Sequence, residues 1–206
     1  MAWVAVVLVT GVVSAAVHAD DEPSARAAPT TASTAITVPV DLSEALVDLS
    51  ASGYTEVPTA ISGVLDLDKI LSAVPAEKQA DVRTGFAGAG FEGGYARASV
   101  PADRRVLVVQ LVFQMGAVLD NPEFARGFAE GVAGASRSGQ TFEVAGIEGA
   151  SGQYATVMSP SAGTKPAVLV FTLVGRRIYL EMVIAASGDV TPDDVIPIAQ
   201  AQAAHG

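Results

Sequence analysis

PAVLVFTLVGRRIYLEMVIAA, residues 166–186, has the pattern of two β-strands joined by a tight turn at Gly175 and Arg176. A glycine at the first turn position favours a type II′ turn, which joins two antiparallel strands with their natural twist. That turn pairs apolar residues across one face: Leu173 with Ile178, Phe171 with Leu180, Leu169 with Met182 and Ala167 with Ile184. Because the turn and the apolar pattern give the same register, they predict an antiparallel hairpin with one face in the core.

The opposite face of this hairpin is only half apolar. It pairs Val174 with Arg177, Thr172 with Tyr179, Val170 with Glu181 and Val168 with Val183. Residues 105–115 show the same asymmetry, with Leu107, Val109, Leu111, Phe113 and Met115 on one side and Val106, Val108, Gln110, Val112 and Gln114 on the other. We therefore expect a sheet with an apolar face and a second face, called the mixed face below.

Helix signals surround these strands and predict an α+β domain, a mostly antiparallel sheet with helices packed against it. Residues 66–73 and 75–85 are expected to form two short helices, and residues 91–100 a strand that pairs with 105–115. Asn121-Pro122-Glu123 and Thr191-Pro192-Asp193 each place a capping residue before a first-turn proline and an acid, so helices are expected over 121–136 and from 192 onward. Pro197 is expected to kink or delay the last helix.

Residues 1–17 carry no charge, and the first ionised residues are Asp20 and Asp21. An apolar run that ends in small residues at Val17 and Ala19 is typical of a secretory signal cleaved after Ala19. The basic start of such a signal is missing, so an uncleaved membrane anchor is an alternative, and a buried N-terminal helix is another. As a helix, 17 to 19 residues would span about 26 to 28 Å, just short of a hydrocarbon core of about 30 Å.

The chain divides into three parts on composition. Residues 1–19 form the signal peptide or anchor. Residues 20–39 are rich in Ala, Ser, Thr and Pro with almost no large apolar side chain, which predicts a flexible linker. Residues 40–206 are expected to form a single α+β domain, large enough to hold a hydrophobic core without a metal or a disulfide.

The charge balance limits the possible partners. The chain has 12 basic and 22 acidic side chains, a net charge of −10, and no cysteine. Nucleic acids and anionic membranes are bound by clustered Lys and Arg, so we expect no nucleic-acid partner and a membrane contact only through an uncleaved N-terminal segment. The lack of cysteine excludes disulfides and Cys-based zinc modules.

The residues of common catalytic sites are missing. His18 lies in the leader and His205 lies one residue from the end of the chain, so neither is expected to act as a general base or a zinc ligand. The motifs S-x-x-K and G-x-S-x-G do not occur. We therefore expect no catalytic residue, no cofactor and no metal.

Two segments imitate ligand-binding loops. Residues 88–93 match the letters G-x-G-x-x-G, but a helix precedes them and a strand follows, the reverse of the dinucleotide-binding order. A helix stop followed by a strand bulge is the better interpretation. Residues 66–77 imitate a calcium loop, but Leu71 stands at the sharp turn that requires glycine.

The mixed face is the main candidate site. A carboxylate inside the apolar segment around Glu181 is costly to bury unpaired, so Glu181 should meet water, Arg97 or a bound cation. Structural pairing and ligand binding are both consistent with this pattern. The candidate ligand-binding residues are Tyr95, Arg97, Gln110, Gln114, Thr172, Tyr179 and Glu181.

A second candidate surface is the expected helix 121–136. Gly127, Gly131 and Gly134 fall between its apolar and charged sectors. Each glycine weakens a helix by about 1 kcal/mol relative to alanine, so three of them suggest that something approaches the backbone closely. That neighbour is either the sheet of this domain or a partner.

Several segments resemble a family of secreted proteins. Residues 85–97, a helix end followed by G-G-Y-A-R and a strand, are similar to small envelope domains of uncharacterised secreted proteins and lipoproteins of actinobacteria, as are residues 124–128, 144–150 and 174–179. The resemblance implies an extracytoplasmic α+β domain, similar to the Mog1/PsbP-type lipoproteins, and brings no catalytic residue with it. This chain lacks the cysteine to which those lipoproteins attach their lipid.

These patterns favour an exported, non-enzymatic domain of the cell envelope, or a secreted one, that binds a protein, a lipid or a small molecule. A hydrolase or transferase of unfamiliar design that uses carboxylates such as Glu181 is the alternative. An accessory module of a larger envelope complex is a third hypothesis.

Overall fold

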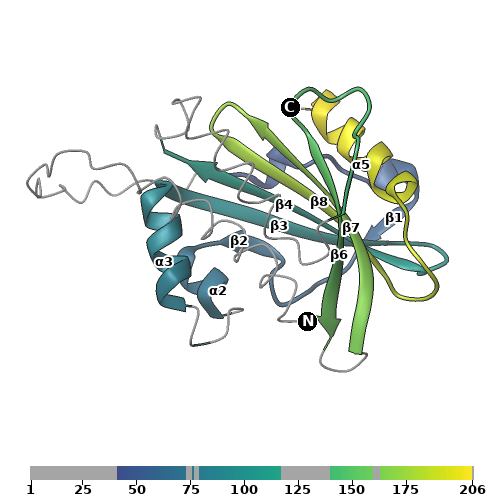
Figure 1. The fold of residues 1–206 in the computed structure, drawn as a ribbon, viewed down its shortest axis with the longest axis horizontal. Helices are drawn as coiled ribbons and strands as arrows, with labels where there is room; N and C mark the ends of the chain where they lie inside the picture. The colour runs from purple at the N-terminus through teal and green to yellow at the C-terminus, as the bar shows by residue number, and fades with distance from the viewer. Residues whose placement is uncertain (1–40, 73–75, 77–78, 117–139, 160–162, 206) are drawn as a thin grey trace, which may run out of the picture.

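The computed structural model describes residues 41–72, 76, 79–116, 140–159 and 163–205 (Figure 1). These residues form an eight-stranded antiparallel sheet in the order β1-β3-β4-β8-β7-β6-β5, and β2 also pairs with β3. The strands are β1 (Tyr54–Glu56), β2 (Gly63–Leu65), β3 (Phe91–Pro101), β4 (Val106–Met115), β5 (Thr141–Phe142), β6 (Ser151–Ser159), β7 (Gly163–Val174) and β8 (Arg177–Ala185). The α-helices are α2 (Leu67–Ser72), α3 (Gln79–Gly88) and α5 (Pro192–His205), and two short 3-10 helices are η1 (Ser43–Ala45) and η2 (Ser50–Ser52). The expected α+β class with a mostly antiparallel sheet is confirmed.

The β7–β8 hairpin has the predicted register. Leu173 pairs with Ile178, and Phe171 pairs with Leu180. Gly175 has φ +57° at the first turn position, as a type II′ turn requires. β8 then pairs with β4 along nine residue pairs, which places the hairpin in the middle of the sheet.

The glycine-rich segment 88–93 is a helix stop and a bulge, as expected. α3 ends at Gly88, and Gly90 has φ +66° in the turn that leads into β3. The β3–β4 register then shifts between Phe91 and Gly93. The two strands form a long hairpin because the apolar alternation continues through both.

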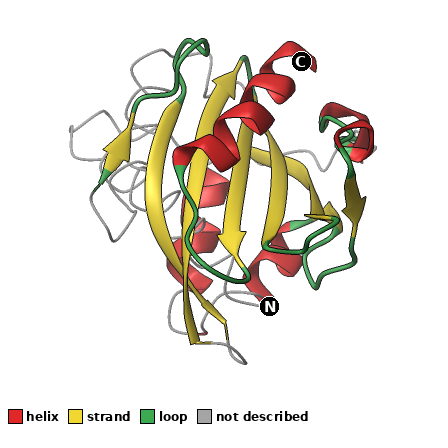
Figure 2. Cartoon of the chain, turned by 90° about the vertical axis from the view of Figure 1, so that its right-hand side faces the viewer, coloured by secondary structure: helices red, strands yellow, loops and turns green. Residues whose placement is uncertain are grey.

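The two faces of the sheet are covered by different elements. α2 and α3 lie on the apolar face (Figure 1). Beneath them, the aromatic rings of Phe86, Phe91 and Phe113 pack edge to face. Figure 2 shows α5, which ends near the label C, crossing the other face of the sheet in front of the strands. The mixed face is therefore an interior surface along most of its length.

α5 covers the mixed face together with residues 42–49, which we call the strap. The buried side of α5 carries Val195, Ile198, Ala199 and Gln202, spaced as one face of a helix. In the strap, Leu49 packs into the cluster under α5, and Leu46 packs with Val112 and Tyr179. The strap and α5 thus form one layer.

Some elements differ from the sequence prediction. β1 and β2 were not expected, because strands of three residues are too short to show alternation. α5 begins at Pro192 as expected, yet it continues through Pro197 without delay, because burial of the neighbouring apolar side chains offsets one lost backbone hydrogen bond.

Several predicted features lie outside the described residues. These are the signal or anchor segment, the linker over 20–39, and the helix expected over 121–136 with its three glycines. Among the residues that the structure describes, no helix has the length and apolar character needed to cross a membrane.

Candidate functional site

The structure brings the predicted site residues together on the mixed face. Arg97, Gln110 and Glu181 lie side by side on β3, β4 and β8 and form one row across the sheet. The next row of the same face contains Tyr95, Val112, Tyr179 and Thr172. Gln114 lies one step further along β4, opposite Arg177.

These residues do not form an open surface. Glu181 is 0% exposed and Gln110 is 1% exposed, and Tyr179 and Thr172 are also buried. The strap and α5 cover these four side chains. A ligand can therefore reach this row only if the strap or α5 moves.

Gln202 of α5 joins the two covering elements. Its Oε1 accepts a hydrogen bond of 2.8 Å from the backbone N–H of Val47, and its Nε2 donates one of 2.8 Å to the carbonyl of Ala45. One turn further on, His205 Nε2 lies 2.8 Å from the carbonyl of Glu44. Because Gln202 is buried, its two bonds satisfy backbone groups that would otherwise lack partners.

Arg97 holds the strap from the side of the sheet. Its guanidinium donates to the carbonyls of Ser43, Leu46 and Val47 at 3.3 to 3.5 Å. Its Nε lies 3.5 Å from Glu56 Oε2, which makes an ion pair but not a hydrogen bond. Arg97 therefore positions the strap.

Gln110 also binds the strap, but only with its donor. Its Nε2 donates to the carbonyl of Val47 at 3.3 Å, while its buried Oε1 has no hydrogen-bond partner. On the neighbouring strand, both carboxyl oxygens of Glu181 are buried and also lack a partner. The centre of the row is thus rich in acceptors and poor in donors.

This environment changes the acidity of Glu181. Burial penalises the charged form and raises the pKa of the Glu181 carboxyl to about 8. The side chain is therefore mostly neutral at pH 7. Its O–H is then a hydrogen-bond donor beside Gln110 Oε1, which otherwise lacks one.

The expected contact between Glu181 and Arg97 is not formed. Gln110 stands between them, so their Cα atoms are two strand spacings, roughly 9 to 10 Å, apart. Arg97 instead binds the strap carbonyls and Glu56. Burial stabilises the neutral acid and removes the need for a cationic partner.

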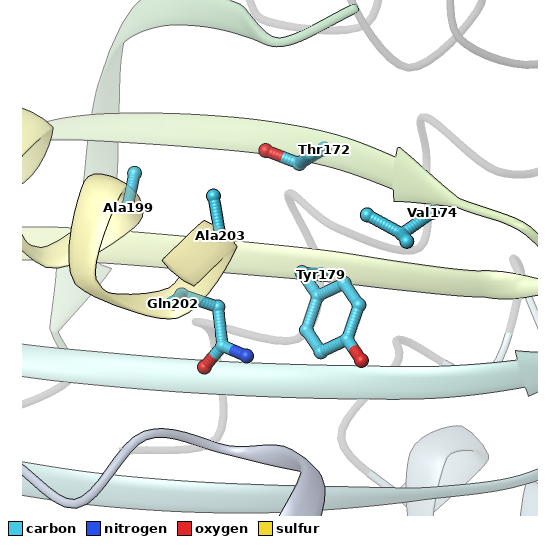
Figure 3. Close-up of a pocket in the computed structure, with 6 residues that line it drawn as sticks. All are labelled: Thr172, Val174, Tyr179, Ala199, Gln202 and Ala203. Atoms are coloured by element: carbon cyan, nitrogen blue, oxygen red, sulfur yellow. The ribbon is translucent and has the colours of Figure 1, made fainter. Parts of the chain in front are cut away.

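A small hollow lies at the end of α5. Figure 3 shows the side chains of Gln202 and Tyr179 next to each other, with Thr172 and Val174 on the adjacent strand. The hollow is also lined by Ala199 and Ala203, and its volume is about 10 Å³. That is room for about one water molecule.

Gln114 and Tyr95 lie at the margin of the row. Gln114 Oε1 accepts a hydrogen bond of 3.3 Å from Arg177 Nε, and its Nε2 donates to the carbonyl of Met115. Tyr95 is half-buried and packs against the strap cluster around Leu42 and Leu46. Both residues have structural contacts here.

Asp66 and Asp68, in the segment that imitates a calcium loop, have ordinary structural roles. Asp66 Oδ1 accepts a hydrogen bond of 2.7 Å from the backbone N–H of Lys69 at the start of α2. Asp68 pairs with Arg83 on the surface at 3.2 Å. Within the described ranges, no three His, Cys, Asp or Glu side chains are grouped closely enough to hold a metal ion.

Sequence reasoning did not identify Gln202 or the strap. Gln202 lies seven residues after Val195, on the buried side of α5. A polar residue on the apolar side of a helix is the sequence pattern that would have identified Gln202. The strap was included in the folded body but had no predicted role.

No model of a known protein family matches this chain, and no curated protein is significantly similar to it.

Proposed function

We propose that this chain is an exported, non-enzymatic domain of the cell envelope that binds a protein, lipid or small-molecule partner there. Residues 1–19 serve as a signal peptide or anchor, and residues 20–39 serve as a flexible linker. Residues 40–206 form a single α+β domain, which the resemblance to Mog1/PsbP-type lipoproteins also implies.

The strap is the observation that carries this proposal. It follows the linker directly in the chain, and Gln202, Arg97 and Gln110 all hydrogen-bond to its backbone. A domain that hangs from an N-terminal linker needs a firm point of attachment. The strap supplies one, because side chains from both the sheet and α5 hold it.

The use of the polar side chains supports a binding role over a catalytic one. Arg97 of the mixed face and Gln202 of α5, which covers it, form hydrogen bonds within the chain rather than facing solvent as a reactive group would. The net charge of −10 favours a neutral or cationic partner at the outer surface.

Export is tested by the mass of the protein recovered from each cell fraction. A chain with a C-terminal tag is expressed in a bacterium, and its intact mass is measured in the medium, the membranes and the cytosol. We expect a mature chain that begins at Asp20. The matched control is Ala19→Phe, which places a bulky side chain at the cleavage position and should leave the leader attached.

Intact, unprocessed wild-type chain dissolved in the cytosol would contradict the proposal.

Binding is tested by photo-crosslinking in living cells, with a photoreactive amino acid at Val174 or Val64, two exposed apolar residues on different parts of the sheet. A discrete crosslinked product from one position and not the other supports a defined partner. Crosslinking at neither position argues against one on these surfaces.

One observation favours an enzyme as the second candidate. A buried carboxyl whose pKa is raised to about 8 is the kind of group that acts as a general acid in catalysis. An envelope hydrolase or transferase built on Glu181 would lose turnover in Glu181→Gln and keep its fold. A binding domain would keep its partner contacts in the same variant.

A further inference from the structure

Three neighbouring oxygen atoms beneath the strap receive no hydrogen bond from any other described residue. They are Gln110 Oε1 and both carboxyl oxygens of Glu181, all buried. The two residues are register partners on β4 and β8, so their Cβ atoms lie about 5 Å apart on the same face. An ionised Glu181 would leave a buried charge beside an unpaired acceptor, which is costly.

The neutral acid removes this conflict. A protonated carboxyl carries one O–H, and Gln110 Oε1 is a suitable acceptor on the adjacent strand. A single hydrogen bond would satisfy both residues. The Nε2 of Gln110 would remain free to hold the carbonyl of Val47, as it does in the structure.

No described charged group around the row pairs with Glu181, so none of them stabilises the carboxylate in place of the bound proton. On the other side of Glu181, β7 contributes Val170, which is apolar. Within the described part of the chain, none of the surrounding charged groups forms an ion pair with Glu181. They are Glu44 and Asp48 of the strap, Glu56 of β1, Arg97 of β3, Arg177 of β8, and Asp193, Asp194 and His205 of α5.

We propose that protonation of Glu181 controls the opening of the strap. In the closed state the Glu181 O–H donates to Gln110 Oε1, and Gln110 holds Val47. When the proton leaves to solvent, the carboxylate is stabilised by a state in which the strap has lifted and water reaches the row. The strap is the element that yields, because its regular structure is limited to the three-residue 3-10 helix η1, whereas β4 and β8 are joined along nine residue pairs.

The sign of the pH dependence follows from linkage. In the open state the carboxyl meets water and has its ordinary pKa near 4.5, whereas the closed state raises the pKa to about 8. The open fraction is therefore smallest below pH 4.5 and increases about tenfold per pH unit between the two pKa values. Above pH 8 it is constant again.

Native-state hydrogen exchange of the full chain tests the proposal. The probe is the backbone amide of Val47, which is bonded to Gln202, and the matched control is the amide of Ala89, which is bonded to Gly85 on the other side of the sheet. Exchange is measured at pH 5, 6, 7 and 8 and corrected for the intrinsic rate. We expect the protection of Val47 to fall about tenfold per pH unit and to stay below that of the β8 amides, which exchange through global unfolding. The protection of Ala89, which opens locally at the end of α3, should stay constant.

Two variants at Glu181 separate the effect of its proton on strap opening from any effect on the stability of the whole domain. Glu181→Gln keeps the shape and a donor for Gln110, and Glu181→Met removes the titrating group with a side chain of similar length. Both are expected to make the protection of Val47 independent of pH. A pH-independent profile in the wild type would overturn the proposal, and so would protection of Val47 equal to that of the β8 amides at every pH, since that indicates that Val47 exchanges only through global unfolding.

Discussion

The two faces of the sheet are closed by different interactions. α2 and α3 close the apolar face through side-chain packing around Phe86 and Phe113. The strap and α5 close the mixed face through apolar contacts combined with hydrogen bonds from Gln202, Arg97 and Gln110. Apolar packing does not depend on the protonation of any group, whereas the hydrogen bonds of the mixed face depend on the protonation of Glu181. We therefore expect pH to act on the contacts of the mixed face and not on the packing of the apolar face.

The largest effect is expected on the apolar face. Phe86 is 1% exposed and contacts both Phe91 and Phe113, so Phe86→Ala leaves a cavity that the sheet cannot fill. The free energy of unfolding should fall by about 3 to 5 kcal/mol, independent of pH. Urea denaturation at pH 5 and pH 8 measures it.

Val64→Ala is the control for this change. Val64 is 63% exposed, so its truncation should cost less than about 0.5 kcal/mol. If Phe86→Ala costs as little as Val64→Ala, the apolar face is not the main source of stability.

The next effect is a pH slope that belongs to the mixed face. Because the fold raises the pKa of Glu181 from 4.5 to about 8, its contribution to stability is full below pH 4.5 and is lost as the pH rises toward 8. The free energy of unfolding of the wild type should fall by about 1.4 kcal/mol per pH unit inside this window. Glu181→Gln should remove the slope, as measured by urea denaturation at each pH.

The described carboxyls with lowered pKa values do not interfere with this measurement. Hydrogen bonds from Ser43 and Ser50 lower the pKa of Asp41 and Asp48. Burial alone would raise the pKa of Asp194, but hydrogen bonds from Thr191 and Arg105 outweigh it and lower the pKa. All three titrate below the window. A wild-type slope that persists in Glu181→Gln would show that another group causes it.

A smaller effect is expected where α5 holds the strap. Gln202→Ala removes two hydrogen bonds and leaves the N–H of Val47 and the carbonyl of Ala45 without this partner. We expect a loss of about 1 to 3 kcal/mol and faster exchange of the Val47 amide. The control is Gln200→Ala on the exposed side of the same helix, where one bond to Ala145 is lost and the cost should be smaller. Equal costs would mean that the strap is not held by Gln202.

The smallest effect concerns the start of α5. Asp194 Oδ2 accepts from the N–H of Thr191, and its Oδ1 accepts from Arg105 at 2.6 Å. Asp194→Ala should lower the free energy of unfolding by about 1 kcal/mol. Asp193→Ala, in the same turn but exposed, should change it by a few tenths. Thermal unfolding of both variants gives the difference.

The sequence was sufficient to predict the centre of the sheet. In the β7–β8 hairpin, the turn glycine and the alternating side chains specify the same register, so one segment determines its own pairing. The side-by-side placement of Gln110 and Glu181 needs the β4–β8 pairing, which links residues about 70 positions apart and has no local signal.

The cover of the mixed face could not be predicted in the same way. Residues 42–49 have no regular period, because they form short turns whose backbone bonds to Arg97 and Gln202 from distant parts of the chain. Of the three partners expected for Glu181, which were water, Arg97 and a bound cation, Arg97 is not in contact with it, for a related reason. Pairing with Arg97 assumes an ionised carboxyl, and only the burial seen in the structure reveals that the neutral form is favoured.

The mixed face is an interior surface, and its burial keeps Glu181 neutral. The most direct test is an NMR titration of the side-chain carboxyl carbon of Glu181, assigned by its loss in Glu181→Gln. We predict a midpoint near pH 8. A midpoint near the ordinary value of 4.5 would show that water reaches the carboxylate and that burial does not keep Glu181 neutral.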